Sequence, residues 1–240
     1  MEQPTQAIVL HATKYGETSV ILHAYTQQGG LRAYVVKGVR SAKRKKTFSM
    51  GMFQPLTQLE LVATTPKSAG LSVLKSAKIT NPYTTISTEI IKSSICLFLA
   101  EVLRSVLKEE EENASLYHFL AHALIWLDTH DKVANVHVHI LIQLTKYLGF
   151  YPDISDISQP YFDVQNGRFC KYANSNECIS GDEVFLLKTY LGTKFDALDT
   201  ILASTEQRRA LLTLIMQYYQ RHAQSFRMPK SLDVLYEVFK

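Results

Sequence analysis

The chain has 240 residues, of which 46% are hydrophobic and 20% charged, and its formal net charge is +4. These ordinary globular values exclude a collagen-like repeat, a coiled-coil rod and a largely disordered chain. The longest apolar runs fall far short of the roughly 20 residues that span a bilayer, and the N-terminus lacks a signal-peptide pattern. Three cysteines, an odd and small number, favour a reducing compartment. We therefore expect a cytoplasmic protein of one or two domains.

Residues 1–80 are strongly basic, whereas the rest of the chain is slightly acidic. Residues 1–80 contain eleven Lys and Arg against three Asp and Glu, a net charge of +8. Residues 81–240 contain fifteen against nineteen, a net charge of −4. This asymmetry indicates two domains and a polyanionic partner for the basic one.

The pattern of apolar and polar side chains in the basic region predicts five strands. The expected strands cover residues 7–13, 19–26, 31–39, 53–63 and 71–79. Glycine-containing turns lie at 27–30 and 65–70. Five strands in about eighty residues predict a small barrel of the OB-fold type, with an SH3-like barrel as the structural alternative.

After Asn81-Pro82 the hydrophobic period becomes helical. Helices are expected over 89–107, 116–127, 133–148 and 232–239. Ser180-x-x-Glu183 and Ser204-x-x-Gln207 match capping boxes and predict two further helix starts. The expected fold class is thus α+β, with an N-terminal five-stranded OB-fold β-barrel over 1–80 and an α-helical domain over 81–240.

The helical domain has a short insertion at residues 150–179. Tyr161 to Val164 and Arg168 to Cys170 flank an Asn-Gly turn, a pattern that predicts a small β-hairpin. The insertion also contains Cys178. A structural zinc ion needs four ligands, usually in close pairs, so two separated cysteines predict two free thiols and no metal.

The segment Lys37 to Lys46 has six basic residues in ten and no acid. Such a run is either a solvated loop or a polyanion-binding loop. Arg32 and Tyr34 on one face of the preceding strand favour binding, because OB-type barrels hold single strands with basic grooves and stacking aromatics. The candidate stacking residues are Tyr25, Tyr34, Phe48 and Phe53, for which burial in the core is the alternative.

No other pattern indicates catalysis. His118 and His122 share a helix face, but no Glu follows His118, so the zinc-protease pattern is absent. No Gly-rich phosphate loop and no G-x-S-x-G motif occur. A nuclease or nucleotidyl transferase would need clustered acids, whereas the basic domain has only Glu2, Glu17 and Glu60. We therefore expect a protein that is not an enzyme.

Several motifs along the chain occur together in one known family. The N-terminal motifs are Ile8-Val9-Leu10, Tyr15-Gly16-Glu17-Thr18, Gly29-Gly30-Leu31, Lys37-Gly38-Val39-Arg40 and Phe53-Gln54-Pro55-Leu56. Leu148-Gly149-Phe150-x-Pro152-Asp153 and Gly167-x-x-Cys170 follow further on. In order and spacing they resemble the bacterial RecO family of recombination and repair proteins.

The resemblance implies a DNA-repair mediator with an N-terminal OB-fold and a helical C-terminal domain. Such a protein binds single- and double-stranded DNA and anneals complementary strands. With RecR it loads RecA onto strands coated by single-stranded-DNA-binding protein (SSB), whose acidic C-terminal tail it contacts. Many members carry a zinc loop with two cysteine pairs, but residues 154–157 lack the first pair here. We thus expect a degenerate zinc-like loop at 150–179, with neither metal nor cofactor, in a nucleoid-associated cytoplasmic protein.

The expected functional residues form two sets. Those expected to contact DNA are Arg32, Tyr34, Lys37, Arg40, Lys43, Arg44, Lys45 and Lys46. An SSB tail should need an apolar pocket rimmed by cations, for which the candidates are Lys146, Tyr147, Arg208, Arg209 and Arg221. Ordinary helix-surface charges are the alternative for this second set. For the whole chain, the alternative is an RNA-binding or translation-associated OB-fold protein.

Overall fold

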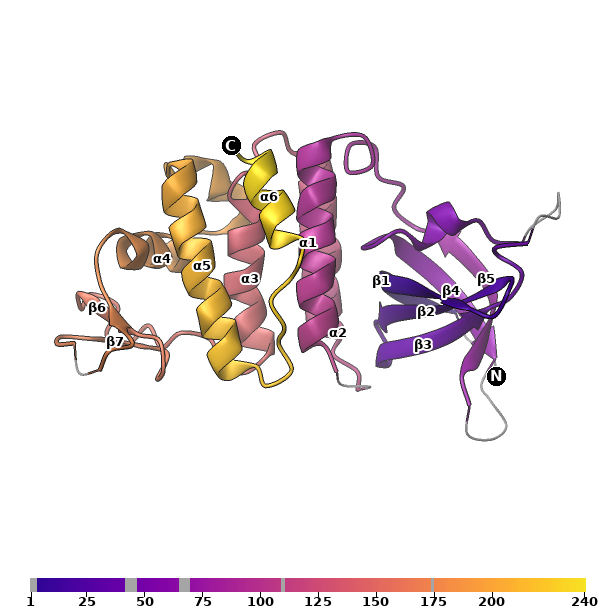
Figure 1. Cartoon of the computed structure of the whole chain (residues 1–240), viewed down its shortest axis with the longest axis horizontal. Coiled ribbons are helices and arrows are strands. Elements are labelled where there is room, and N and C mark those ends of the chain that lie inside the picture. The colour runs from indigo at the N-terminus through magenta and orange to yellow at the C-terminus, as the bar shows by residue number, and fades with distance from the viewer. Residues whose placement is uncertain (1–3, 42–46, 65–69, 109–110, 174) are drawn as a thin grey trace. The chain divides into compact units, whose positions relative to one another are not determined.

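The computed structural model describes residues 4–41, 47–64, 70–108, 111–173 and 175–240 (Figure 1). Its contacts divide the chain into two compact units, Met1–Thr129 and His130–Lys240. The first unit contains the barrel and two helices, and the second contains the remaining helices and a small sheet.

The N-terminal barrel is closed and has the strand order β1-β2-β3-β5-β4. The five strands are β1 (Thr5–Tyr15), β2 (Ser19–Thr26), β3 (Gly30–Val36), β4 (Gln58–Thr64) and β5 (Ser72–Ile79). β3 and β5 are parallel, and the other neighbours are antiparallel. The predicted five-stranded, OB-like barrel is confirmed.

The barrel interior is filled by the inward side chains of all five strands. It includes Val9, Leu22, Val36, Leu61 and Leu74, each at most 3% exposed. In β1 the alternate positions Ile8 and Leu10 are buried as well, although they lie outside this core cluster. Helix α1 (Ile90–Val106) contacts β1. The strand is therefore apolar on both faces, because one face fills the barrel and the other is also shielded from water.

The fourth strand begins later than its apolar pattern predicts. Met50–Phe53 forms a 3-10 helix, η1, and β4 starts only at Gln58. Between them Leu56 has φ 62°, and its N–H donates to the Val9 carbonyl at 2.7 Å. Pro55 has no N–H to offer a neighbouring strand, so this segment turns against β1 instead of extending the sheet.

A buried carboxylate joins the segment after the barrel to the end of helix α2 (Ala114–Thr129). Asp128 accepts the backbone N–H groups of Thr84, Thr85 and Ile86 at 2.8–3.1 Å. Burial raises the pKa of Asp128, but these N–H groups outweigh burial and lower it from 3.8 to about 2. Lys92, whose side chain is fully buried, donates to the Asp128 carbonyl and to the Thr85 hydroxyl.

The second unit is mainly helical, as predicted. Its helices are α3 (Val136–Tyr147), α4 (Asp182–Gly192), α5 (Thr205–His222) and α6 (Leu232–Val238), with the 3-10 helix η2 (Phe195–Thr200) between α4 and α5. In the part of the chain that the structure covers, no helix combines the length and the apolar character needed to cross a membrane.

The two predicted capping boxes have different outcomes. At α5 the Ser204 hydroxyl accepts the Gln207 N–H, and the Gln207 side chain accepts the Ser204 N–H. This prediction is confirmed. At α4 the predicted helix is present, but the predicted capping box is wrong, since the N-cap residue is Gly181 with φ 91°, and no side chain caps the helix. Ser180 therefore lies one residue before the N-cap, and Val184 takes the N3 position, so the box residues are out of register with the helix start.

The inserted hairpin is present and gains a third strand. β6 (Tyr161–Asp163) pairs with β7 (Arg168–Cys170) and with β8 (Cys178–Ile179), in the order β7-β6-β8. In the turn, Gly167 has φ 63°, and an added Cβ would lie 2.4 Å from the Tyr218 hydroxyl oxygen. Both the backbone angle and the close approach of Tyr218 require glycine here.

Candidate nucleic-acid interface

Exposed cations gather where β1 turns into β2 and where β3 ends. The backbone N–H of Arg40 donates to the Thr18 carbonyl at 2.9 Å, and its guanidinium group donates to the Gly16 carbonyl at 3.4 Å. Lys14 pairs with Val20 on β2, which in turn pairs with Val36 at the end of β3. This register places Lys14 at the same end of the barrel as Lys37 and Arg40. All three side chains are exposed. We call Lys14, Lys37 and Arg40 the basic barrel end.

Lys14 was absent from the residues expected from sequence. It lies inside the first strand and two residues before the Gly16 turn, so it is distant in sequence from Lys37. Only the antiparallel pairing of β1, β2 and β3 brings it to the same end. An isolated lysine beside a turn is too common to identify as a site from sequence alone.

Arg32 lies toward the other end of β3 from Lys37. At about 3.3 Å per residue, the two positions are roughly 17 Å apart along the chain. An added Cβ at Gly29 would lie 2.8 Å from Arg32 Nε, so the arginine side chain lies against the β2–β3 turn. The structure therefore does not bring all the predicted cations together, but places Arg32 and the basic barrel end at opposite ends of one strand.

The outer face of β2 and β3 between these ends is half-buried and mostly apolar, with His23 opposite Ala33 as its polar member. Ile21 on β2 and Leu31, Ala33 and Val35 on β3 alternate with inward-facing residues. In OB-folds, this strand pair and its adjoining loops commonly bind oligonucleotides. Cations at either end can neutralise phosphates, while the apolar middle can contact bases.

The four candidate stacking aromatics are buried. Tyr25 and Phe53 are 3% exposed, and Tyr34 and Phe48 are 6% exposed. Tyr34, Phe48 and Phe53 belong to the barrel core, where burial raises the pKa of Tyr34 while Arg32 opposes that rise. The structure thus favours the core alternative, and a stacking role for Tyr34 stays a prediction. The predicted contacts Lys43, Arg44, Lys45 and Lys46 lie outside the described residues.

Two histidines pair across β1 and β2. The rings of His11 and His23 stack with centroids 4.2 Å apart and planes 6° apart. Burial, His23 and Arg104 of α1 lower the pKa of His11 to about 4, and burial and Arg104 lower that of His23. Both rings are therefore neutral at neutral pH, so the positive charge of this surface comes from Lys and Arg.

The arginines predicted to bind a partner are engaged within the second unit. Arg208 donates to the Ala203 carbonyl, and Arg209 donates to the Tyr236 carbonyl while its guanidinium lies over the Tyr236 ring. Arg221 forms an ion pair with Glu177. Arg208 and Arg221 are roughly 20 Å apart along α5, at 1.5 Å per residue. These arginines therefore do not form one cluster.

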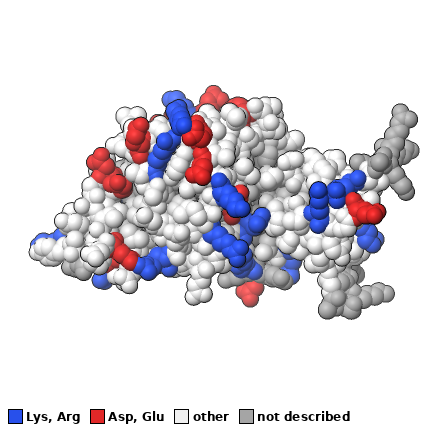
Figure 2. Space-filling view, in the orientation of Figure 1, with Lys and Arg blue, Asp and Glu red and all other residues white. Residues whose placement is uncertain are grey.

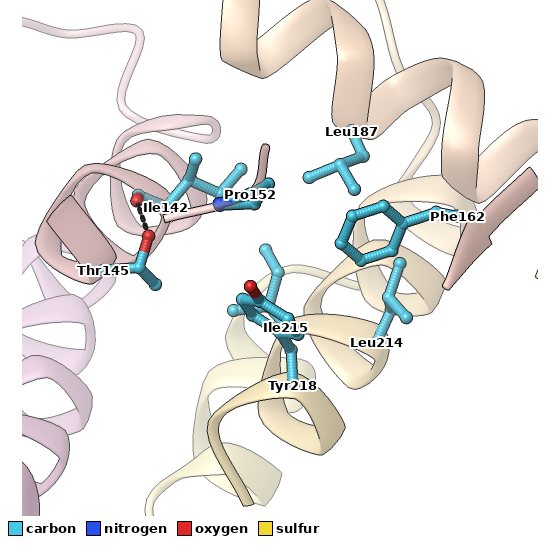
Figure 3. A pocket seen from close by; sticks show the side chains of 8 residues that line it. All are labelled: Ile142, Thr145, Pro152, Phe162, Leu187, Leu214, Ile215 and Tyr218. Carbon is cyan, nitrogen blue, oxygen red and sulfur yellow. Dashed lines mark hydrogen bonds between the residues drawn. The ribbon is translucent and has the colours of Figure 1, made fainter. Parts of the chain in front are cut away.

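Lys146 and Tyr147 lie at the end of α3, and Thr145, which precedes them, lines an apolar pocket (Figure 3). The Lys146 ammonium lies 4.5 Å from the centroid of the Tyr151 ring, and burial raises the pKa of Tyr147. The pocket is a small cavity with a volume of about 20 Å³. Its lining residues are Ile142, Thr145, Pro152, Phe162, Leu187, Leu214, Ile215 and Tyr218.

The polar atoms of this pocket are satisfied internally. The Thr145 hydroxyl donates to the Ile142 carbonyl at 2.6 Å, and the Tyr218 hydroxyl donates to the Phe150 carbonyl at 2.7 Å. What remains open is therefore apolar. The pocket suits a small apolar group better than a polar one, and Lys146 follows Thr145 directly on α3.

The insertion does not supply the ligands of a structural zinc ion. The Cys170 and Cys178 sulfur atoms lie 4.0 Å apart. Among the described residues, no group of three or more His, Cys, Asp or Glu side chains could hold a metal ion. A tetrahedral zinc site needs four such ligands. The residues present therefore do not fit the zinc ion that the family resemblance implies for many members.

The chain thus has the architecture of the proteins that combine an N-terminal OB-like barrel with a helical region carrying a small β-insertion. The model of the family described as "Recombination protein O N terminal" matches residues 1–83, and that of "Recombination protein O C terminal" matches residues 87–232. The chain belongs to the RecO family, as its sequence motifs suggested.

Full-length relatives agree with this assignment. The chain is 43% identical over 235 residues to the DNA repair protein RecO of Christiangramia forsetii, covering 98% of each chain. It is 40% identical over 239 residues to the protein of that name from Flavobacterium psychrophilum, and 36% identical over 243 residues to that of Bacteroides fragilis. Both of these alignments cover 100% of each chain.

Proposed function

We propose that this chain is a DNA repair and recombination mediator rather than an enzyme. It binds single- and double-stranded DNA, anneals complementary strands and, with RecR, helps load RecA onto SSB-coated single strands. Membership of the RecO family supports the role in repair and recombination. We assign DNA binding to residues 1–80 and protein contacts to residues 81–240.

The observation that carries DNA binding is the basic barrel end. Lys14, Lys37 and Arg40 are exposed there, and the chain continues from Arg40 into the basic residues Lys43 to Lys46. Lysine and arginine neutralise phosphates and release counterions, which gives affinity without sequence preference. Because two DNA strands repel each other, neutralising both on one surface also lowers the barrier to annealing.

Charge reversal in the basic run tests the proposal. Replacing Lys43, Arg44, Lys45 and Lys46 with Glu should weaken single-strand binding at least tenfold at moderate salt, measured by fluorescence anisotropy. A matched control reverses four exposed cations of the second unit, namely Lys132, Lys194, Arg227 and Lys230. Equal affinities of wild type and the basic-run variant would reject the assignment.

Annealing assays separate the proposed function from its alternatives. We expect the chain to accelerate pairing of complementary single strands, also when cognate SSB coats them. An RNA-binding or translation-associated protein would instead prefer single-stranded RNA in direct competition. A nuclease would cleave labelled DNA when magnesium is added.

We further propose that the SSB tail binds beside the end of α3. Lys146 follows Thr145, which lines an apolar pocket, and Arg221 carries an exposed positive charge that is shared with Glu177. An acidic tail that ends in an apolar residue suits such a combination. A fluorescent tail peptide should bind the Lys146→Ala/Arg221→Ala variant more weakly than wild type, and equal binding would exclude this choice of residues.

A further inference from the structure

The insertion holds two thiols close together, on strands that flank a common neighbour. β6 pairs with β7, which ends at Cys170, and with β8, which begins at Cys178. The two sulfur atoms are 4.0 Å apart, and both residues are partly exposed. A disulfide requires a sulfur–sulfur distance of about 2.05 Å, so the sulfurs must approach each other by roughly 2 Å.

Burial and the neighbouring Cys178 raise the pKa of the Cys170 thiol, so the closeness of the two sulfur atoms, and not an acidic thiol, favours their reaction. The described residues of the segment that joins β7 to β8, 171–173 and 175–177, form bends and turns. Because β6 lies between the two cysteine strands, closing the gap requires the backbone of β7 or β8 to move as well as the side chains. No third metal-ligating side chain accompanies them in the described part of the insertion. Cys96 is 4% exposed in the first unit, and burial raises its pKa to about 12, which makes it an unreactive internal reference.

We propose that Cys170 and Cys178 form a reversible intramolecular disulfide with low-molecular-weight disulfides such as oxidised glutathione. This modification site is independent of the proposed DNA function. The disulfide would be a covalent cross-link across the small sheet. It would stand in place of a metal cross-link, which the residues present here do not support.

The reaction balances without any further reactant. One cysteine, as its thiolate, attacks oxidised glutathione, forms a mixed disulfide and releases one glutathione thiolate. The second cysteine thiolate then attacks the protein sulfur of that mixed disulfide and releases the other glutathione. The protein loses two protons and two electrons in total, and the glutathione disulfide is reduced to two thiols.

The cross-link would close the segment that contains Glu177. This residue pairs with Arg221 of α5, and its carboxylate accepts from both Nε and a terminal nitrogen of the guanidinium group. Oxidation would thus restrict the loop that ties the insertion to α5. Because a cross-link limits the unfolded chain, the oxidised protein should also unfold at a higher temperature than the reduced protein.

Intact-mass measurement tests the site on the full chain. The protein is incubated with oxidised glutathione and a metal chelator, quenched with acid and digested without reduction. We expect wild type to lose two hydrogens and to yield a cross-linked peptide that contains Cys170 and Cys178. Dithiothreitol should restore the original mass and the lower unfolding temperature.

Two variants separate the proposed reaction from simple thiol exposure. Cys178→Ser lacks the second thiol, so Cys170 should keep one glutathione, and Cys170→Ser should behave in the mirror-image way. Stable glutathione adducts on both cysteines of wild type, or only intermolecular dimers, would overturn the proposal. So would complete resistance of both thiols while a small maleimide still labels them.

Discussion

The basic barrel end and the helices use charged side chains in different ways. Lys14, Lys37 and Arg40 are exposed around one end of the barrel. Arg209 and Asp128, in contrast, bind carbonyl or amide groups within the fold. Figure 2 shows cations and acids side by side on both the helical part and the barrel. The exposed cations of the barrel end are therefore available to a polyanion, even though the Arg40 guanidinium also donates to the Gly16 carbonyl, whereas Arg209 and Asp128 mainly stabilise the structure.

The largest expected effect concerns the buried carboxylate of Asp128. Asp128→Ala removes the acceptor of three backbone N–H groups and should lower the free energy of unfolding by about 3 kcal/mol. Chemical denaturation at pH 7 measures this loss. Undiminished stability would show that water can replace the carboxylate.

The same residue gives a prediction for acid. Its pKa is lowered in the fold to about 2 from 3.8, so its contribution is complete above about pH 4 and is lost as the pH falls toward 2. The difference in unfolding free energy between wild type and Asp128→Asn should therefore shrink over this range. A difference that is constant from pH 5 to pH 2 would contradict the lowered pKa.

The next effect concerns an engaged cation of α5. Arg209→Ala removes the hydrogen bond to the Tyr236 carbonyl and the cation–π contact, whose distance to the ring centroid is 5.2 Å. We expect a loss of about 2 kcal/mol in stability and no change in single-strand affinity. A clear loss of DNA binding in a folded Arg209→Ala protein would break the proposed distinction between the two regions.

The basic barrel end should show the opposite behaviour. Lys14→Glu, Lys37→Glu and Arg40→Glu together should weaken single-strand binding about tenfold, or about 1.4 kcal/mol, and flatten its dependence on salt. Thermal unfolding should change little, because these side chains are exposed. The Lys132, Lys194 and Lys230 triple reversal is the matched control.

The smallest effect belongs to the ion pair of Arg221 and Glu177. Their side chains are 48% and 36% exposed, so Glu177→Gln should change stability by less than about 1 kcal/mol. If Arg221 contacts a partner, freeing it from Glu177 should instead strengthen binding of an acidic tail peptide. Unfolding and peptide titration of the same variant separate these two quantities.

Local signals in the sequence account for much of the fold. The strand over 19–26 and the Ser204 capping box depend on neighbouring residues, and both are present in the structure. The third strand of the insertion, β8, has only two residues and so leaves no detectable period. The Ser180 box shows the limit of motifs, because Gly181 and not Ser180 occupies the N-cap position of α4.

The candidate DNA-binding site was predictable as a region of exposed cations and less so as a list of residues. The alternation along β3 placed Arg32, Tyr34 and Val36 on one face, but alternation does not distinguish the barrel interior from its rim. In the structure, Tyr34 and Val36 fill the core, whereas Arg32 at the rim is exposed. Lys14 could be found only once the strands were paired.

The sequence alone determined the order of a basic strand region and a slightly acidic helical region, because charge and hydrophobic period are properties of neighbouring residues. It also carried the family motifs. Only the tertiary structure decided which cations remain exposed, which aromatics form the core and which two cysteines meet. Each of these depends on contacts between residues far apart in the chain, and such contacts have no period in the sequence.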